Sequence, residues 1–167
     1  MTATGRLEDD GRTLLLPRSF RAPVEDVWAS VTESERVGRW FGTWTGDPAD
    51  GFVMVSMNAE AEPVPPARFD IVVCEPPHRL TVESRDVHGT WRITVELSEA
   101  DGATTLLFRQ DDLDPSSAHE IGPGWEWYLD RLVAVHEGRR PPDLEDFETT
   151  YLALADPYTA MLPPPAT

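Results

Sequence analysis

Two periodicities divide the chain into strands and helices. Between residues 52 and 110, short runs alternate apolar and polar residues and are separated by Gly, Pro, Asn and Asp. That period of two predicts β-strands with one buried face. Strands are expected at residues 13–22, 52–58, 67–75, 78–86, 89–99 and 103–110. Because short turns join successive strands, the sheet is predicted to be antiparallel, with one apolar face that another element must cover.

Two short helices are predicted between the first two strands. Val24, Val27, Trp28 and Val31 follow the i, i+3, i+4, i+7 spacing of an amphipathic helix. A second helix is expected in SERVGRWFG (residues 34–42), with Ser34 as its cap and an end near Gly42.

A longer helix is predicted in IGPGWEWYLDRLVAVHEG (residues 121–138), beginning where Gly122 and Gly124 flank Pro123. Its broad apolar stripe would cover the sheet. The stripe consists of Ile121, Trp125, Tyr128, Leu132 and Val135, and the side expected to point away holds Glu126, Asp130, Arg131 and Glu137. Trp127 lies off the stripe and needs another partner.

A further helix is predicted after the break at RRPPD (residues 139–143). Leu144, Phe147, Tyr151 and Leu154 share one of its faces, which is expected to pack back on the domain near Trp127. We therefore divide the chain into a domain at residues 13–138 and a C-terminal extension at residues 139–167.

The charge balance narrows the classes of partner. Acids outnumber bases 30 to 14, for a formal charge of −16, and all the bases are arginines. The negative electrostatic potential of such a chain argues against binding to nucleic acid and to anionic membranes. Since no run approaches the length of a membrane span and no apolar export signal is seen, we expect a cytoplasmic protein. Cys74, the single cysteine, is interpreted as a small buried hydrophobe.

Three motifs carry a family resemblance. Ala22, Pro23, Glu25, Val27 and Trp28 fit the pattern A-P-x-E-x-V-W, and Glu35, Trp40 and Phe41 fit E-x-x-x-x-W-[FW]. Gly124, Trp125, Leu129 and Leu132 fit G-W-x-x-x-L-x-x-L. The sequence thereby resembles the SRPBCC/START-like superfamily and, within it, the family of activators of heat-shock-protein-90 ATPase (AHSA-type). The resemblance implies an α+β helix-grip fold, in which a curved antiparallel sheet surrounds a long C-terminal helix and leaves a cavity that in relatives holds lipids, polyketides or hormones.

The candidate site is the lining of that cavity. Strand alternation and helix faces direct a set of large side chains inward, with a few polar groups that could orient a ligand. The predicted ligand-binding residues are Trp40, Phe41, Trp44, Met54, Phe69, Ser84, Trp91, Phe108, Gln110, Trp125, Tyr128 and Leu132. Ser84, Gln110 and Tyr128 are its polar points, with Asn58 as a further candidate. The inward positions are neutral, so no catalytic residue is predicted.

Metal and cofactor chemistry finds no support in the sequence. The four histidines form no closely spaced pair, and the acidic run RQDDLDPSSAHE (residues 109–120) lacks the spacing of a calcium loop. No phosphate-binding or hydrolase motif occurs. We therefore expect neither a metal nor a cofactor.

Three functions stay open at this stage. The first is non-catalytic binding of a small hydrophobic molecule. The second is a protein-interaction module, either a regulator of a chaperone or a homodimer whose face would include Trp127 and the last helix. The third is a cyclase or dehydratase like some members of the superfamily.

Overall fold

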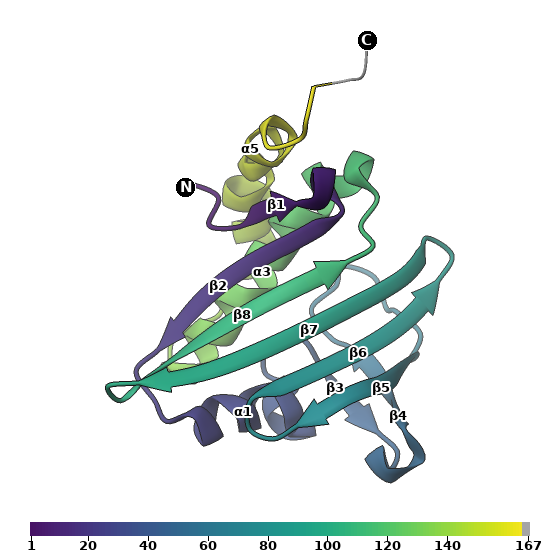
Figure 1. The fold of residues 1–167 in the computed structure, drawn as a ribbon, viewed down its shortest axis with the longest axis vertical. Coiled ribbons are helices and arrows are strands. Elements are labelled where there is room, and N and C mark those ends of the chain that lie inside the picture. The colour runs from purple at the N-terminus through teal and green to yellow at the C-terminus, as the bar shows by residue number, and fades with distance from the viewer. Residues whose placement is uncertain (165–167) are drawn as a thin grey trace.

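Eight antiparallel strands form one curved sheet, and the long helix α3 (Ala118–His136) packs across its inner face (Figure 1). This computed structural model describes residues 1–164. The strand order is β1-β2-β8-β7-β6-β5-β4-β3. The strands are β1 (Arg6–Glu8), β2 (Thr13–Phe20), β3 (Gly42–Thr45), β4 (Phe52–Met57), β5 (Ala67–Glu75), β6 (Arg79–Asp86), β7 (Gly89–Ala100) and β8 (Ala103–Asp111). This architecture is the helix-grip arrangement expected from the sequence.

Local sequence explains two features of the strands. Asp101 and Gly102 both adopt positive φ in the turn between β7 and β8, which is the conformation that favours Asp-Gly in two-residue hairpins. Pro17 lies where β1 no longer pairs with β2, because β1 reaches only from Thr13 to Leu15 of its neighbour. Its missing N–H therefore breaks no ladder on that side.

Two strands were not predicted. β1 has three residues and β3 has four, too few for an alternating pattern to be recognised. Both lie at the edges of the sheet, and β3 occupies the segment where the second short helix was expected to end.

The two short helices are present, but the second is shorter than predicted. α1 spans Val24–Thr32 and α2 spans Ser34–Val37, so α2 ends at Val37 rather than near Gly42. Ser34 does not cap α2, because Glu33 holds the N-cap position. Instead the Ser34 hydroxyl donates to the Trp44 carbonyl at 2.7 Å and accepts from the Trp44 N–H at 2.8 Å. Ser34 thus fastens the helices to β3.

Helix α3 begins earlier than predicted. Its first residue is Ala118, so Pro123 lies inside the helix rather than at its start. A proline there removes one backbone hydrogen bond. A 3-10 turn at Pro115–Ser117 leads directly into the helix. The Asp114 side chain caps this turn by accepting a hydrogen bond from the Ser116 N–H at 2.9 Å. The residues around Pro123 resemble a helix start, but this upstream turn sets the actual boundary.

The C-terminal segment packs against α3 and lies near β1 (Figure 1). It consists of α4 (Leu144–Asp146), a π-helical turn at Phe147–Tyr151, a 3-10 turn at Leu152–Leu154 and α5 (Ala155–Ala160). Phe147 packs edge-on against Trp127 with ring centroids 5.5 Å apart, and the Trp127 indole donates to the Asp143 carbonyl at 3.0 Å. Trp127 is 3% exposed, so it cannot form the dimer face considered from the sequence.

α5 rests in a notch at the start of α3. A Cβ placed on Gly122 would come within 2.5 Å of the Tyr158 ring. Only a glycine lets the ring lie this close to the helix backbone. Tyr158 is fully buried, and no pattern in the sequence indicated its role.

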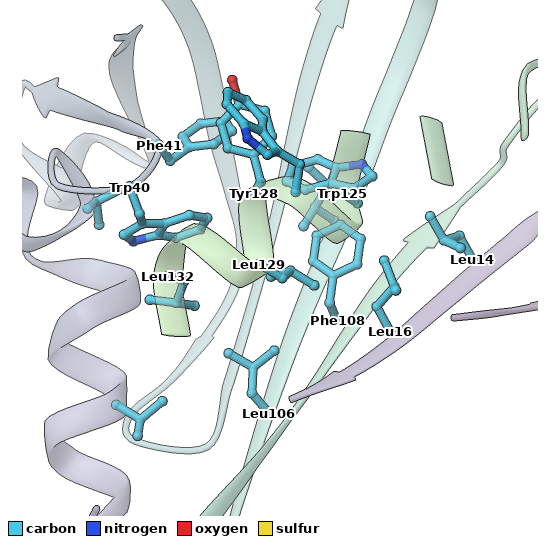
Figure 2. Close-up of a cluster of buried hydrophobic side chains, with 14 of the residues drawn as sticks. Leu14, Leu16, Trp40, Phe41, Leu106, Phe108, Trp125, Tyr128, Leu129 and Leu132 are labelled. Atoms are coloured by element: carbon cyan, nitrogen blue, oxygen red, sulfur yellow. The ribbon is translucent and has the colours of Figure 1, made fainter. Parts of the chain in front are cut away.

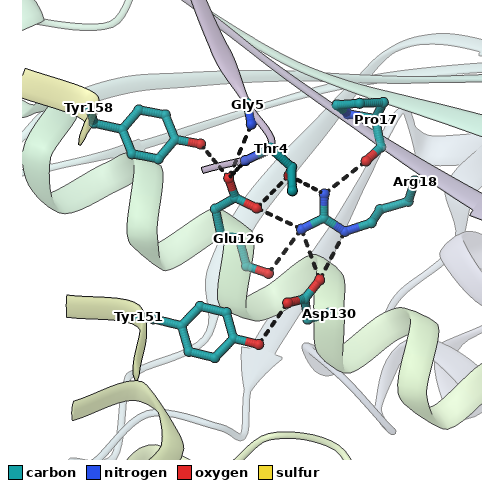
Figure 3. Close-up of polar contacts among 8 residues, drawn as sticks. All are labelled: Thr4, Gly5, Pro17, Arg18, Glu126, Asp130, Tyr151 and Tyr158. Carbon is teal, nitrogen blue, oxygen red and sulfur yellow. Dashed lines mark hydrogen bonds and ion pairs between the residues drawn. The ribbon is translucent and has the colours of Figure 1, made fainter. Parts of the chain in front are cut away.

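The notch adjoins a buried ionic network that joins both ends of the chain to α3 (Figure 3). Glu126 is 2% exposed, whereas the sequence pattern placed it on the solvent side of the helix. Its carboxylate accepts from the Thr4 and Tyr158 hydroxyls at 2.6 and 2.8 Å and from Arg18 at 2.8 Å. Arg18 also pairs with Asp130 at 2.9 Å. Segments far from α3 in the sequence therefore bury Glu126, although the amphipathic pattern of the helix alone would leave it exposed.

Within residues 1–164, no helix combines the length and apolar character that crossing a bilayer requires.

Candidate ligand-binding cavity

A cavity of about 210 Å³ lies between the inner face of the sheet and α3. The strands supply its walls through alternate residues: β6 gives Leu80 and Val82, while β8 gives Leu106 and Phe108. α3 contributes Trp125, Leu129 and Leu132, which recur every three or four residues along one side of the helix. The sheet and helix therefore pack together without filling the space between them.

The exposure of the lining residues locates a mouth and a floor. Leu106, Leu129 and Leu132 are fully buried and form the floor. Pro48 and Cys74 line the same cavity and are exposed. The Ile71 N–H donates to the Gly51 carbonyl at 2.8 Å, which holds the β3–β4 connection against β5. The mouth thus opens between that connection, the end of α1 and the hairpin joining β5 to β6.

The polar atoms of the aromatic lining are already paired. The Trp40 indole donates to the Ser30 carbonyl at 3.0 Å, and the Trp44 indole donates to the Thr32 carbonyl at 2.8 Å. The Trp125 indole donates to Gln110 Oε1 at 2.7 Å. Thr32, the one hydroxyl-bearing residue of the lining, donates to the Trp28 carbonyl at 2.7 Å. The interior consequently presents an apolar surface.

Aromatic rings close one part of the cavity (Figure 2). Phe41 and Trp125 are nearly parallel, at 10° and 6.0 Å between centroids, and Phe108 lies 4.4 Å from Trp125. Rings this close leave no space for another ring between them. The part of α3 around Trp125 therefore fills part of the core and also forms one wall of the cavity.

Seven of the twelve predicted site residues line the cavity. They are Trp40, Phe41, Trp44, Phe69, Phe108, Trp125 and Leu132. The other five do not: Met54, Ser84, Trp91, Gln110 and Tyr128.

Met54 was assigned to the wrong face of its strand. Val53 and Val55 line the cavity and are buried, so the alternation of β4 directs Met54 to the other side. FVMVSM is apolar at nearly every position, and such a run does not reveal which residues face inward.

Trp91 and Ser84 pair with each other across β7 and β6, away from the cavity. The Trp91 indole donates to Asp86 at 2.9 Å, near the hairpin that joins the two strands. Alternation along a strand identifies the face on which a residue lies, but not whether the cavity extends that far along the sheet.

Gln110 and Tyr128 are engaged by protein groups. Gln110 is buried and accepts from Trp125. The Tyr128 hydroxyl donates to the Glu60 carboxylate, in the loop between β4 and β5. Burial first, and then this bond, raise the pKa of Tyr128 above its ordinary value. Asn58, the further candidate, is exposed and donates to the Gly38 carbonyl at 2.8 Å.

A β-bulge places Cys74 at the mouth rather than in the core. The pairing of β5 with β6 shifts between Ile71 and Val73, so both Ile71 and Cys74 line the cavity although they are three residues apart. A bulge adds one residue to a strand and changes its alternation. The sequence-based interpretation of Cys74 as a buried hydrophobe was therefore wrong.

No Asp, Glu, His, Lys or Arg lines the cavity. Elsewhere within residues 1–164, no three His, Cys, Asp or Glu side chains converge in an arrangement suited to a metal ion. The arrangement can hold an apolar body by van der Waals contact, and its lining contains no carboxylate or imidazole for proton transfer.

The helix-grip fold and its apolar cavity define a protein of the SRPBCC type. The family model of "Activator of Hsp90 ATPase homolog 1-like protein" matches residues 21–137, and the chain belongs to that family. No curated protein matches the chain.

Solved structures share the fold over most of the chain. CalU16 from Micromonospora echinospora is 27% identical, with a TM-score of 0.74 over 94% of this chain and 93% of that one. A protein from Bordetella parapertussis is 23% identical, with a TM-score of 0.73 over 96% and 93% of the two chains. DynU16, from the dynemicin biosynthetic locus, is 23% identical, with a TM-score of 0.60 over 78% of this chain and 49% of its own.

Proposed function

We propose that this protein binds a small hydrophobic molecule, without catalysing its conversion, in the cavity between the curved sheet and α3. The observation that carries the proposal is a cavity of about 210 Å³ with an apolar lining and a mouth at Pro48 and Cys74. Transfer of an apolar molecule from water into such a space is favourable.

The aromatic lining also favours a binding role. Trp40, Trp44 and Trp125 are held by hydrogen bonds to the protein, so their rings are fixed before a ligand arrives. A preformed wall lowers the entropic cost of binding. Micromolar affinity is expected for a ligand small enough for this cavity, because affinity is limited by the number of ligand atoms.

The comparisons agree with a binding role but do not identify the ligand. DynU16 comes from a biosynthetic locus, yet its likeness to this chain shows the fold alone. Family membership is equally compatible with protein binding. The proposal therefore rests on the cavity.

The test compares two leucines that are adjacent in β8. Leu106 lines the cavity, whereas Leu107 lies on the opposite face of the strand and is half-buried. Leu106→Trp should fill the cavity, and Leu107→Trp makes the same change outside it. Val82→Phe is a second blocking variant, at a half-buried lining position.

The first measurement is native mass spectrometry of freshly purified protein, and the second is thermal unfolding with naphthalene derivatives. A ligand that binds the folded state raises Tm. We expect an adduct or a Tm increase in the parent protein and in Leu107→Trp, and neither in the blocking variants. An unchanged response in folded Leu106→Trp and Val82→Phe would place binding outside the cavity and overturn the proposal.

A further inference from the structure

We propose that the cavity selects a compact aromatic molecule that is neutral or cationic, and that carboxylates at its mouth exclude anions. This inference rests on the proposed function, because it concerns the ligand of the same cavity. Its three supports are the volume of the cavity, the pairing of its polar atoms and the charge at the mouth.

The volume sets the size of the ligand. An apolar cavity of about 150 Å³ holds one benzene molecule. The present cavity, at about 210 Å³, suits two fused rings or one ring with a short substituent. Long acyl chains would extend well beyond the mouth. The rings of Trp40, Trp44 and Phe69 line the space and favour a ligand that offers aromatic faces or edges.

The interior offers no free hydrogen-bond partner to a polar ligand atom that has left water. The indole N–H groups of the lining are occupied by protein acceptors, as is the Thr32 hydroxyl. Burying an unpaired polar group costs free energy, and burying an unpaired charge costs far more. A polar substituent would therefore lie at the mouth, where solvent reaches it.

Three acids are neighbours in sequence of residues that line the cavity. Glu33 follows the lining residue Thr32, Asp47 precedes Pro48, and Glu75 follows Cys74. All three acids are exposed. They belong to the end of α1, the β3–β4 connection and the end of β5, the three segments between which the mouth opens.

One arginine lies near these acids. Arg79, which precedes the lining residue Leu80 and pairs with Glu75 across β5 and β6, lies 3.8 Å from Glu96. Among the ion pairs of residues 1–164, none includes Glu33, Asp47 or Glu75. The formal charge of −16 over the whole chain adds to the same negative potential. A ligand carboxylate held at the mouth would meet this potential, whereas an ammonium group would be attracted.

The experiment uses three probes that share one ring system: naphthylmethanol, naphthylmethylammonium and naphthoate. Their affinities are measured by calorimetry and by tryptophan fluorescence at low salt. Naphthoate is expected to bind about tenfold more weakly than naphthylmethanol, and naphthylmethylammonium at least as tightly. Raising the salt concentration should reduce both differences, because exposed charges are screened.

A variant that neutralises the three acids, called the rim variant, tests whether they cause the weaker binding of naphthoate. It combines Glu33→Gln, Asp47→Asn and Glu75→Gln. The Asp47→Asn change keeps a side-chain oxygen for the Ala49 N–H, which now donates to the Asp47 carboxylate at 2.9 Å. A control variant, with Glu145→Gln, Glu148→Gln and Asp156→Asn, changes the net charge equally at exposed positions of the C-terminal segment.

The outcomes separate the two proposals. Stronger naphthoate binding in the rim variant, but not in the control variant, supports charge selection at the mouth. Two results would overturn charge selection and leave hydrophobic binding in place. One is equal affinity of the parent protein for all three probes, and the other is an equal gain in naphthoate affinity in the rim and control variants. Failure of all three probes to bind would count against the proposed function itself, and against the selection with it.

Discussion

The indole N–H of Trp125 donates to Oε1 of Gln110 at 2.7 Å, and both side chains are buried. The sequence had suggested that Gln110 would orient a ligand. Instead it anchors the ring that forms one wall of the cavity, and the protein itself satisfies both polar groups. A polar residue on the inner face of the sheet therefore contributes to the rigidity of the apolar lining rather than to its polarity.

Gln110→Met should destabilise the protein without abolishing ligand binding. Methionine has a similar size but no strong acceptor, so the Trp125 N–H would be buried without a partner, at a cost of about 1–3 kcal/mol. For a chain of this length, Tm should fall by about 2–4 °C for each kcal/mol. Naphthylmethanol affinity should change less than about threefold. A complete loss of binding in a folded variant would show that Gln110 contacts the ligand after all.

Two glycines of α3 should respond oppositely to alanine. At Gly122 an added Cβ meets the Tyr158 ring at 2.5 Å, whereas at Gly124 nothing lies within 4 Å. Gly122→Ala is expected to displace α5 and to cost about 2 kcal/mol. Gly124→Ala should stabilise the protein by up to about 1 kcal/mol, because alanine favours the helical conformation. Urea unfolding measures both, and a stabilising Gly122→Ala would contradict the packing of Tyr158 in the notch.

The stability of the protein should fall in acid partly through Glu126. Burial alone would raise the pKa of Glu126, but hydrogen bonds from Thr4, Arg18 and Tyr158 outweigh it and hold the pKa below the ordinary value of 4.5. The unfolded state then binds more protons just below pH 4.5, so the contribution of Glu126 is present above that pH and is lost as the pH falls toward the folded-state pKa.

Glu126→Gln tests this contribution. The variant should lose about 2 kcal/mol near pH 7, because the buried Arg18 would keep only Asp130 as a carboxylate partner. Its free energy of unfolding should also depend less steeply on pH below 4.5 than that of the parent protein. Parallel pH profiles for the two proteins would show that Glu126 does not titrate as the network requires.

Cys74 provides a probe of the mouth. It is the single cysteine of the chain and is exposed beside the cavity. Alkylation by iodoacetamide should be slower in the presence of saturating naphthylmethanol, because the bound molecule would obstruct the thiol. The Leu106→Trp variant, whose cavity is filled, should show no such protection. Protection that persists in that variant would indicate binding elsewhere.

The strand pattern predicted much of the cavity because alternation is a local property of the pleated chain. Phe108 faces the cavity as predicted, and Leu106, Leu80 and Val82 line it through the same alternation along β8 and β6. The prediction failed where that local rule was interrupted or ambiguous. The bulge between Ile71 and Val73 changed the alternation, and the uniformly apolar β4 concealed the outward direction of Met54.

The sequence by itself determined the order of the longer strands and the main helices, the antiparallel sheet and the apolar stripe of α3, since each follows from periodicity and turn residues close together in the chain. The tertiary structure alone decided that Glu126 is buried, that Tyr158 fits against Gly122 and that a void remains beneath Trp125. These features depend on how segments far apart in sequence meet. Burial and empty volume are sums over all neighbouring side chains, and no short stretch of sequence contains that sum.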